Sequence, residues 1–440
     1  MEKTEDRLHD LLSRAKKAGA DDAEVLSTNA EAISVSVRKG TLEGLERSEA
    51  GDLSLRVFVG NKQAVVSSTM RDAGTLQALA DRAVAMARCA PDDPFCGVAP
   101  VTASVWPDLD LEDPSDVLPE DLAARARRTE EGARAVAGVT NSAGAEACWQ
   151  RQGMALATSR GFYGRLTRTT HSLSVSVLAG EGTAMQRDHD VATSVFAEDL
   201  PSPESVGTKA GMRAVARLHP RKTAGGCVPV FFEPRVGVEL IGALAEAVSG
   251  VSVARGTSFL KDALGKKIFS DAITIVDDPH RPRGLRSRPF DGEGVATARR
   301  NVIDKGVLTT WLLDGRSARQ LGMTDTGHAA RAFGKGPSPS NMFIEAGTLD
   351  PEALMRDVAQ GFYVTETMGM GINGVTGDYS QAASGFWIEN GQKVFPVGEM
   401  TLAGNLRGMF LTMTAANDLV FERGLDTPTL RIDGMMVGGL

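Results

Sequence analysis

The sequence predicts an α+β protein in which antiparallel sheets carry packed helices, arranged as an N-terminal lobe and a larger C-terminal lobe. The segment SLSVSV (residues 172–177) alternates strictly between apolar residues and serines, a pattern typical of an antiparallel sheet with one packed and one solvated face. Residues 384–397 read as a β-hairpin with Asn390-Gly391 at its turn. Strands and helices do not alternate along the chain as a parallel α/β fold requires.

We divide the chain into an N-terminal α/β segment (1–90), a linker (91–118), a central α+β segment (119–222) and a C-terminal domain (223–440). The linker is rich in Pro and Asp and has little periodicity. The N-terminal segment is expected to hold, in order, the following elements: a helix over 5–18, two short strands within 23–40, a hairpin over 52–69 and a helix over 71–90.

The central segment is expected to begin and end with a helix and to hold four strands between them. These elements lie at 119–138 (helix), 145–152, 153–160, 171–180 and 190–198 (strands) and 204–219 (helix). The C-terminal domain begins with a short apolar strand and a helix over 237–250. It continues with many short strands and turns, among them a hairpin at 301–314 that leads into a helix at 315–322.

The composition is that of an ordinary globular chain. Its 440 residues are 42% hydrophobic and 24% charged, with a net charge of −8 and a pI near 5.5. The acidic balance argues against nucleic acid as a partner. No apolar run approaches 18 residues, so no membrane span is expected. The N-terminus is charged from its second residue and has no apolar signal core, so we expect a cytoplasmic protein.

Motifs with a known chemistry are few. The four cysteines (Cys89, Cys96, Cys148, Cys227) have no metal-binding spacing, and the histidines form no HxH or HExxH pair. GMGING (Gly369 to Gly374) matches GxGxxG, but no amphipathic helix follows, so we interpret it as a loop. No GxSxG nucleophile motif occurs.

One basic segment leaves two interpretations open. HRPRGLRSRPF (280–290) holds four arginines in eleven residues. It could bind an anion, a peptide carboxylate or the acidic surface of a partner. It could equally be a solvated loop.

The helix over 237–250 carries two glutamates, Glu239 and Glu246, two turns apart on one face. At about 100° per residue they lie opposite the apolar arc of the helix. That arc consists of Leu240, Ile241, Leu244 and Val248. An amphipathic helix places such charges outside, so we interpret both as a solvated face rather than a catalytic pair.

Longer stretches of the chain resemble the TldD/PmbA family, and in particular its PmbA (TldE) branch. The most specific of them is VTGDYSQAASGFWIENG, within residues 361–406. Residues 46–69, 289–294 and 429–439 resemble the family as well, so the likeness covers nearly the whole chain.

What the resemblance implies about metal depends on the helix over 237–250. TldD-type members read Gly-Val-x-Leu-His-Glu-x-x-x-His there, which supplies metal ligands. In this chain the His, Glu and His positions of that motif hold Ile241, Gly242 and Glu246. The family's further ligand is a cysteine, and no cysteine follows Cys227 here. A catalytic zinc needs three protein ligands. The resemblance therefore implies no catalytic residue, no metal and no cofactor in this chain, with zinc in a TldD-type partner.

The resemblance thus implies the non-catalytic subunit of a TldD–TldE type metallopeptidase, a hetero-oligomer that processes unstructured peptides, including precursors of peptide natural products. Asp378, Tyr379 and Phe386 are the candidate peptide-binding residues, unless they pack the core. Two alternatives stay open: a metal-independent, peptide-binding or chaperone-like homodimer, and an independently active hydrolase.

Overall fold

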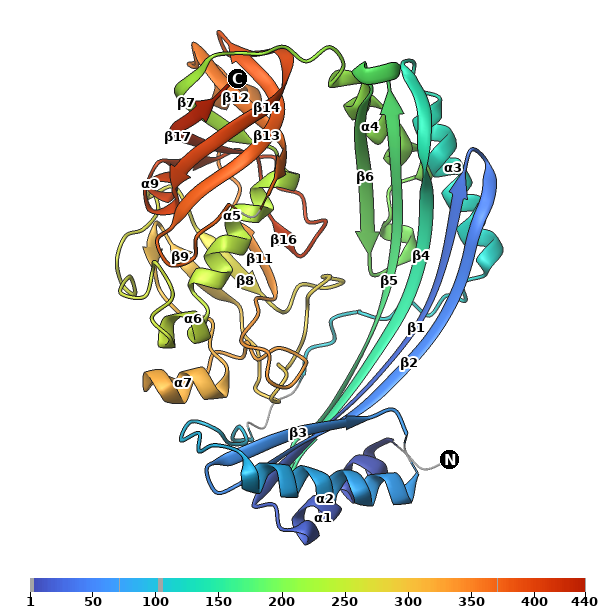
Figure 1. Ribbon diagram of the computed structural model, residues 1–440, viewed down its shortest axis with the longest axis vertical. Coiled ribbons are helices and arrows are strands. Elements are labelled where there is room, and N and C mark those ends of the chain that lie inside the picture. The colour runs from blue at the N-terminus through green and yellow to red at the C-terminus, as the bar shows by residue number, and fades with distance from the viewer. Residues whose placement is uncertain (1–3, 71, 102–105, 370, 440) are drawn as a thin grey trace.

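The computed structural model describes residues 4–70, 72–101, 106–369 and 371–439, which form two lobes (Figure 1). The N-lobe (residues 4–218) is built on a six-stranded antiparallel sheet with the strand order β3-β2-β1-β4-β5-β6. The strands of this sheet are β1 (Asp22–Arg38), β2 (Thr41–Val59), β3 (Lys62–Ser68), β4 (Val139–Thr158), β5 (Tyr163–Ala179) and β6 (Gln186–Ser194).

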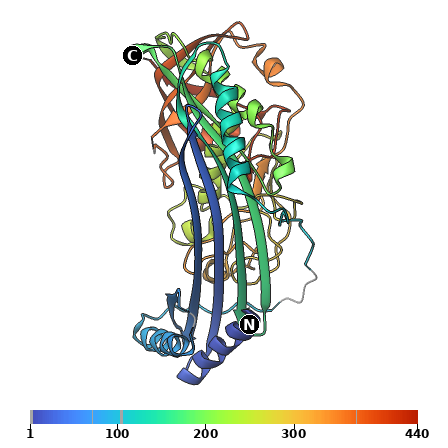
Figure 2. The ribbon, with the colours of Figure 1, turned by 90° about the vertical axis from the view of Figure 1, so that its right-hand side faces the viewer.

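The central strands of this sheet are unusually long. β1, β2, β4 and β5 have 17 to 20 residues each, so they span roughly 55–65 Å at about 3.3 Å per residue. They run side by side down the height of the molecule (Figure 2). The prediction of two short strands within 23–40 and two within 145–160 was wrong. Each of these segments belongs to a single long strand, β1 in the first case and β4 in the second. The apolar alternation is interrupted at exposed Asn29 and at Gly153, where the strands continue between two separate cores.

Four helices cover the outer face of the sheet and explain those two cores (Figure 1). α1 (Thr4–Ala18) and α2 (Ala73–Cys89) pack on its lower end, and α3 (Pro119–Arg134) and α4 (Pro203–Ala216) pack on its upper end. In β5, Leu173, Val175 and Val177 are buried under α3 and α4, while the serines between them lie on the inner side. The predicted division of this strand into packed and solvated faces is therefore confirmed. Two short 3₁₀ helices flank β6, η1 (Gly182–Ala184) and η2 (Ala197–Asp199).

The C-lobe (residues 225–439) contains two further sheets. The first has the order β14-β13-β12-β7-β17-β15 and the second β10-β9-β8-β11-β16. Most pairings are antiparallel, as predicted, but β7 with β12 and β11 with β16 are parallel. The strands are β7 (Gly225–Phe232), β8 (Ile275–Asp278), β9 (Arg300–Asp304), β10 (Val307–Leu308), β11 (Asn341–Ile344), β12 (Gln360–Met368), β13 (Asp378–Glu389), β14 (Gln392–Asn405), β15 (Met413–Ala415), β16 (Leu425–Asp426) and β17 (Leu430–Gly438).

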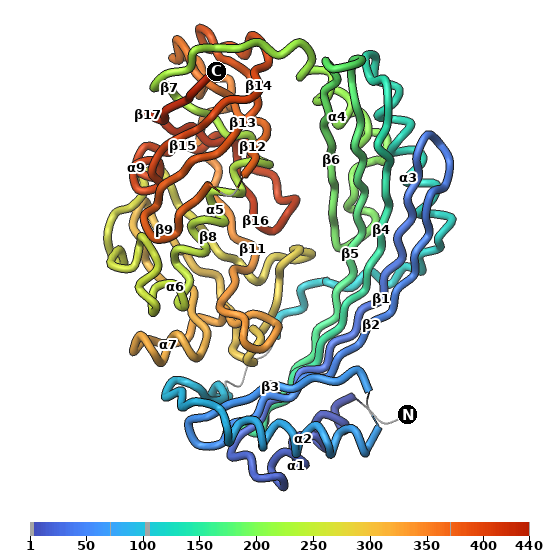
Figure 3. Tube along the Cα trace, viewed as in Figure 1, coloured from blue at the N-terminus to red at the C-terminus, as the bar shows by residue number. Residues whose placement is uncertain are grey.

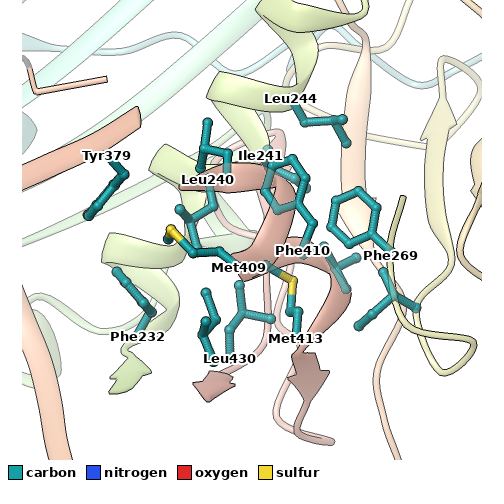
Figure 4. Packing of buried hydrophobic residues seen from close by; sticks show 14 of the residues in the cluster. Phe232, Leu240, Ile241, Leu244, Phe269, Tyr379, Met409, Phe410, Met413 and Leu430 are labelled. Atoms are coloured by element: carbon teal, nitrogen blue, oxygen red, sulfur yellow. The ribbon is translucent and has the colours of Figure 1, made fainter. Parts of the chain in front are cut away.

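Short helices complete the C-lobe, and α5 lies at its centre. They are α5 (Pro234–Ala247), α6 (Gly250–Ala254), α7 (Gly315–Leu321), α8 (Pro351–Met355) and α9 (Leu406–Leu411). The apolar side of α5 packs against α9 and the sheet, in one large buried cluster (Figure 4). Within that cluster the rings of Phe269 and Phe410 stack with their centroids 4.3 Å apart.

Local turn chemistry follows the sequence closely. Asn390 and Gly391 both have positive φ, 49° and 78°, as the two-residue type I′ turn of a hairpin requires. The described part of 91–118 holds no helix or strand, and the strands on either side of it join the same sheet (Figure 3). None of the helices within the described ranges combines the length and the apolar character needed to cross a membrane.

Candidate functional site

The helix α5 is the first candidate for a functional site, because three of its positions correspond to the ligand positions named above. Pro234 stands at the start of the helix, where its missing N–H costs no hydrogen bond. Leu240, Ile241 and Leu244 then turn inward into the core (Figure 4). Ile241 is 1% exposed, so the first of the three positions carries a hydrocarbon chain that is buried in the lobe.

The other two positions point elsewhere. A Cβ placed on Gly242 would meet no atom within 4 Å, so this face of the helix is open. Glu246 is exposed, and its Oε1 accepts a hydrogen bond from Ser252 Oγ at 2.9 Å. Ile241 is buried in the core whereas Glu246 is exposed, so the two side chains do not converge on a common point.

These residues do not fit a catalytic zinc ion. Isoleucine and glycine have no donor atom, and one exposed carboxylate is fewer than the three protein ligands that such a site needs. In the part of the chain that the structure describes, no group of three or more His, Cys, Asp or Glu side chains is arranged to hold a metal.

Glu239 behaves differently from Glu246. It is partly buried, and its carboxylate accepts hydrogen bonds from Thr367 Oγ1 of β12 at 2.8 Å and from Gln381 Nε2 of β13 at 2.5 Å. The solvated-face interpretation is therefore right for Glu246 and wrong for Glu239. The apolar arc located the helix correctly, but it contained no information on the polar residues of the strands beneath.

Glu239 also lines a cavity of about 540 Å³ between the two lobes. One wall consists of α5 and β12 from the C-lobe, and the other of β6 and α4 from the N-lobe. The other charged lining residues are Asp188, Asp190, Arg213, Arg217, Arg235, Glu366, Glu422 and Arg423. β6 ends the strand order of its sheet, and no described strand pairs with its outer edge.

All four arginines that line this cavity are paired with carboxylates. Arg235 Nη1 donates to Asp188 Oδ1 at 2.7 Å, and Arg213 Nη1 donates to Asp190 Oδ1 at 2.6 Å. Arg217 forms a third ion pair, with Glu366 of β12. Burial alone would raise the pKa of Asp188, but Arg235, the His189 main chain and Arg217 together outweigh it and hold that pKa below its usual range. The network fixes the two lobes against each other and lines the cavity with charged side chains.

Sequence reasoning missed this network, although part of its signal was available. Arg213 and Arg217, the residue that follows the last turn of α4, are four residues apart and therefore lie on the same side of that helix. Their acidic partners lie on strands remote in sequence, and only the fold brings them together.

The three candidate peptide-binding residues of β13 are not brought together. Asp378 is exposed and accepts hydrogen bonds from Thr376 Oγ1 and Asn405 Nδ2, which lower its pKa. Tyr379 is 1% exposed and packs edge-on against Phe232 (Figure 4). For Tyr379 the structure favours the packing alternative. Phe386 is half-buried beside a small apolar cluster, and contact of Asp378 and Phe386 with peptide stays a prediction.

The main chain of the glycine-rich loop before β13 is hydrogen-bonded to the start of that strand. Ser380 N donates to Gly371 O at 2.7 Å, and Asn373 N donates to Asp378 O at 2.8 Å. A Cβ on Gly371 would lie 1.4 Å from Ser380 O, so only glycine permits this contact. Met370, within the same motif, lies outside the described residues. The main chain at the start of β13 is thus largely occupied by this loop.

Comparison with known proteins accounts for nearly the whole chain. Residues 225–439 match the PmbA/TldA metallopeptidase C-terminal domain, residues 112–218 the central domain and residues 23–87 domain 1. The protein named Metalloprotease PmbA of Escherichia coli O157:H7 is 37% identical over 424 residues, which cover 96% of this chain and 93% of that protein.

Solved structures show the same fold. A protein from Bacteroides thetaiotaomicron superimposes with a TM-score of 0.92 and 27% identity, covering all of both chains. TldE from Thermococcus kodakarensis superimposes with a TM-score of 0.87 and 19% identity, covering 98% of this chain and all of that one. At that identity the second likeness is one of fold.

Proposed function

The chain belongs to the PmbA/TldD metallopeptidase family, and from this membership we propose that it is the PmbA (TldE) type subunit of a heteromeric metallopeptidase. In this proposal the metal and its ligands belong to a TldD-type partner. This chain binds the unstructured peptide substrate and completes the site without supplying a metal ligand.

The observation that carries the proposal is the state of α5. At the positions where TldD-type members have metal ligands, this chain has a buried Ile241, an open Gly242 and an exposed Glu246. Metal-dependent peptide hydrolysis requires an ion that activates water. A chain with this helix needs that ion from another subunit.

The cavity beside α5 supports a role in binding peptide. Its charged lining residues and the outer edge of β6 suit an extended chain, which adds to a sheet edge through main-chain hydrogen bonds. No described strand pairs with that edge, although Asp188 and Arg235 already contact the His189 main chain. Such binding has little sequence preference because it uses groups that every residue has. We therefore place the peptide along β6 and not against the buried Tyr379.

The test is reconstitution. The purified chain, a TldD-type subunit from the same organism and their mixture are each incubated with an unfolded polypeptide. We expect cleavage by the mixture, its loss on chelation, and its loss when the partner's ligand histidines are replaced. No cleavage is expected from this chain alone.

Two results would contradict the proposal and favour an alternative. Turnover by this chain alone in the presence of chelator would indicate an independent hydrolase. If the TldD-type subunit alone were as active as the mixture, this chain would not be part of the peptidase. That result would favour a metal-independent peptide-binding homodimer.

A further inference from the structure

A cluster of arginines between the lobes forms no salt bridges among the described residues, and nearby aspartates balance only part of its positive charge, at Arg286 and Arg288. It consists of Arg168 on β5, Arg286 and Arg288 in the basic loop after β8, and Arg331 after α7. No carboxylate of the described residues forms a salt bridge with any of the four. Other buried arginines do have such partners, for example Arg56 with Glu24.

Arg168 is buried, yet it lines a cavity. It is 8% exposed, its Nη2 donates to Ser287 O across the lobe boundary, and its Nε has no hydrogen-bond partner among the described atoms. Burial and then the guanidinium groups of Arg331 and Arg288 lower its pKa to about 9. Burial, with Arg288 and Arg286, likewise lowers the pKa of Arg331 to about 10.

This arrangement is costly without an anion. Removing a charge from water is unfavourable unless it is paired and hydrogen-bonded, and like charges at close range add to that cost. A bound anion would reverse both effects. Guanidinium groups with free N–H donors suit carboxylate, which they bind by two parallel hydrogen bonds.

Arg168 and Arg331 line a cavity of about 1040 Å³ on the inner face of the N-lobe sheet. Cross-strand register places Ala50, Ala30, Gln152 and Arg168 in one row across β2, β1, β4 and β5. Asp52 lines the same cavity at its β2 end. The cavity thus runs from an acidic side chain to two arginines. Three inter-strand spacings separate β2 from β5, which is about 14 Å.

Both the charge and the length suit a short peptide with free termini. An extended chain advances about 3.4 Å per residue, so roughly four residues span the distance from Asp52 to Arg168. The small side chains of Ala30 and Ala50 leave room over the middle strands, and the amide of Gln152 offers a donor and an acceptor for the peptide main chain.

We propose that this cavity binds a peptide of about four residues, with its C-terminal carboxylate on Arg168 and Arg331 and its amino terminus towards Asp52. The inference rests on the proposed function, because a peptidase releases such fragments. It assigns to the chain a site for product-length peptides, distinct from the cavity beside α5.

The experiment is isothermal titration of the full-length chain with tetra-alanine that has free termini, with its C-terminal amide, and with inorganic phosphate. We expect saturable binding of the free acid and at least tenfold weaker binding of the amide, because charge-assisted hydrogen bonds to the carboxylate are lost. Arg331→Gln should weaken binding of the acid at least tenfold and leave binding of the amide nearly unchanged. Arg165→Gln, on the same β5 but with an exposed side chain, is the matched control and should change neither.

Three outcomes would overturn the inference: equal binding of acid and amide, binding of phosphate but not of the peptide, and no binding of either. The comparison of acid with amide uses the unmodified protein, so it stands even where a variant fails to fold. Cleavage by the reconstituted mixture is measured separately. If the mixture cleaves peptide normally but the chain shows no carboxylate-dependent binding, the inferred site is wrong and the proposed function still stands.

Discussion

Arg56 of β2 donates from Nη2 to Glu293 Oε1 at 3.1 Å, and this contact joins the two lobes. The same guanidinium donates from Nε to Glu24 Oε2 of β1 at 2.5 Å. All three side chains are buried, and the ring of Phe333 covers the guanidinium at 4.6 Å. One cation thus stands between two buried carboxylates at the base of the inter-lobe surface.

Replacing Arg56 should therefore be strongly destabilising. In Arg56→Met both carboxylates lose their charged partner while they stay buried, and breaking a buried pair in this way costs about 3–5 kcal/mol. The free energy of unfolding is measured by urea denaturation at pH 8, where Glu24 is ionised. Arg47→Met, at an exposed pair on the same strand, is the control and should change it by less than about 1 kcal/mol. Equal effects of the two substitutions would contradict this account.

Glu24 should make stability depend on pH. Burial raises its pKa to about 7 against an ordinary value of 4.5; Arg56 opposes this shift and Glu293 adds to it. Between these two pH values the folded state holds a proton that the unfolded state has lost. The stabilisation is therefore complete below about pH 4.5 and disappears as the pH rises through about 7.

The measurement compares the wild type with Glu24→Gln, which imitates the protonated form. From pH 5.5 to pH 8 the wild type should lose on the order of 2 kcal/mol of unfolding free energy relative to the variant. Other titrating groups are common to both proteins and cancel. A constant difference between the two across this range would show that Glu24 is ionised throughout.

Two positions of α5 should respond oppositely to the same substitution. Ile241→Ala removes buried methyl groups beside α9 and should cost about 2–5 kcal/mol. Glu246→Ala removes an exposed side chain and should stay within about 0.5 kcal/mol of the wild type. Urea midpoints for the pair provide the test. A large loss at Glu246 together with a small one at Ile241 would mean that the helix is rotated from this orientation.

The contrast between these residues shows what sequence could predict. Periodicity located α5 and its buried arc, because an amphipathic helix encodes its own orientation. Asn390-Gly391 predicted its hairpin because few residue pairs adopt positive φ at both positions. Both signals are local, and the structure confirmed both.

The features that sequence reasoning missed depend on residues far apart in the chain. Glu239 finds its donors on β12 and β13, more than 120 residues away. Arg168 meets Ser287 across the lobe boundary, so the basic segment at 280–290 is neither a free loop nor a complete site by itself. The length of β1 was also missed, since it depends on which helices cover the sheet.

Metal content tests the division of labour between the subunits. The purified chain should contain well under one equivalent of zinc after dialysis, because Ile241 and Gly242 offer no ligand. Elemental analysis of the chain and of a TldD-type subunit prepared in parallel provides the comparison. About one zinc per chain, lost on substitution within α5, would contradict the proposed function.

The last prediction concerns Glu239, which connects α5 to the strands beneath it. Glu239→Ala leaves Thr367 and the 4% exposed Gln381 without their acceptor. An unsatisfied buried polar group costs about 1–3 kcal/mol, so the variant should lose that amount of unfolding free energy. Glu239→Gln keeps an acceptor oxygen of the same reach and should lose less. If Glu239 instead had only the solvated role of Glu246, alanine at both positions would be equally harmless.

In the reconstituted peptidase, Glu239→Ala should also weaken peptide binding, because this residue lines the cavity beside β6. The expected sign is a raised KM with little change in kcat, since Glu239 has no part in the chemical step.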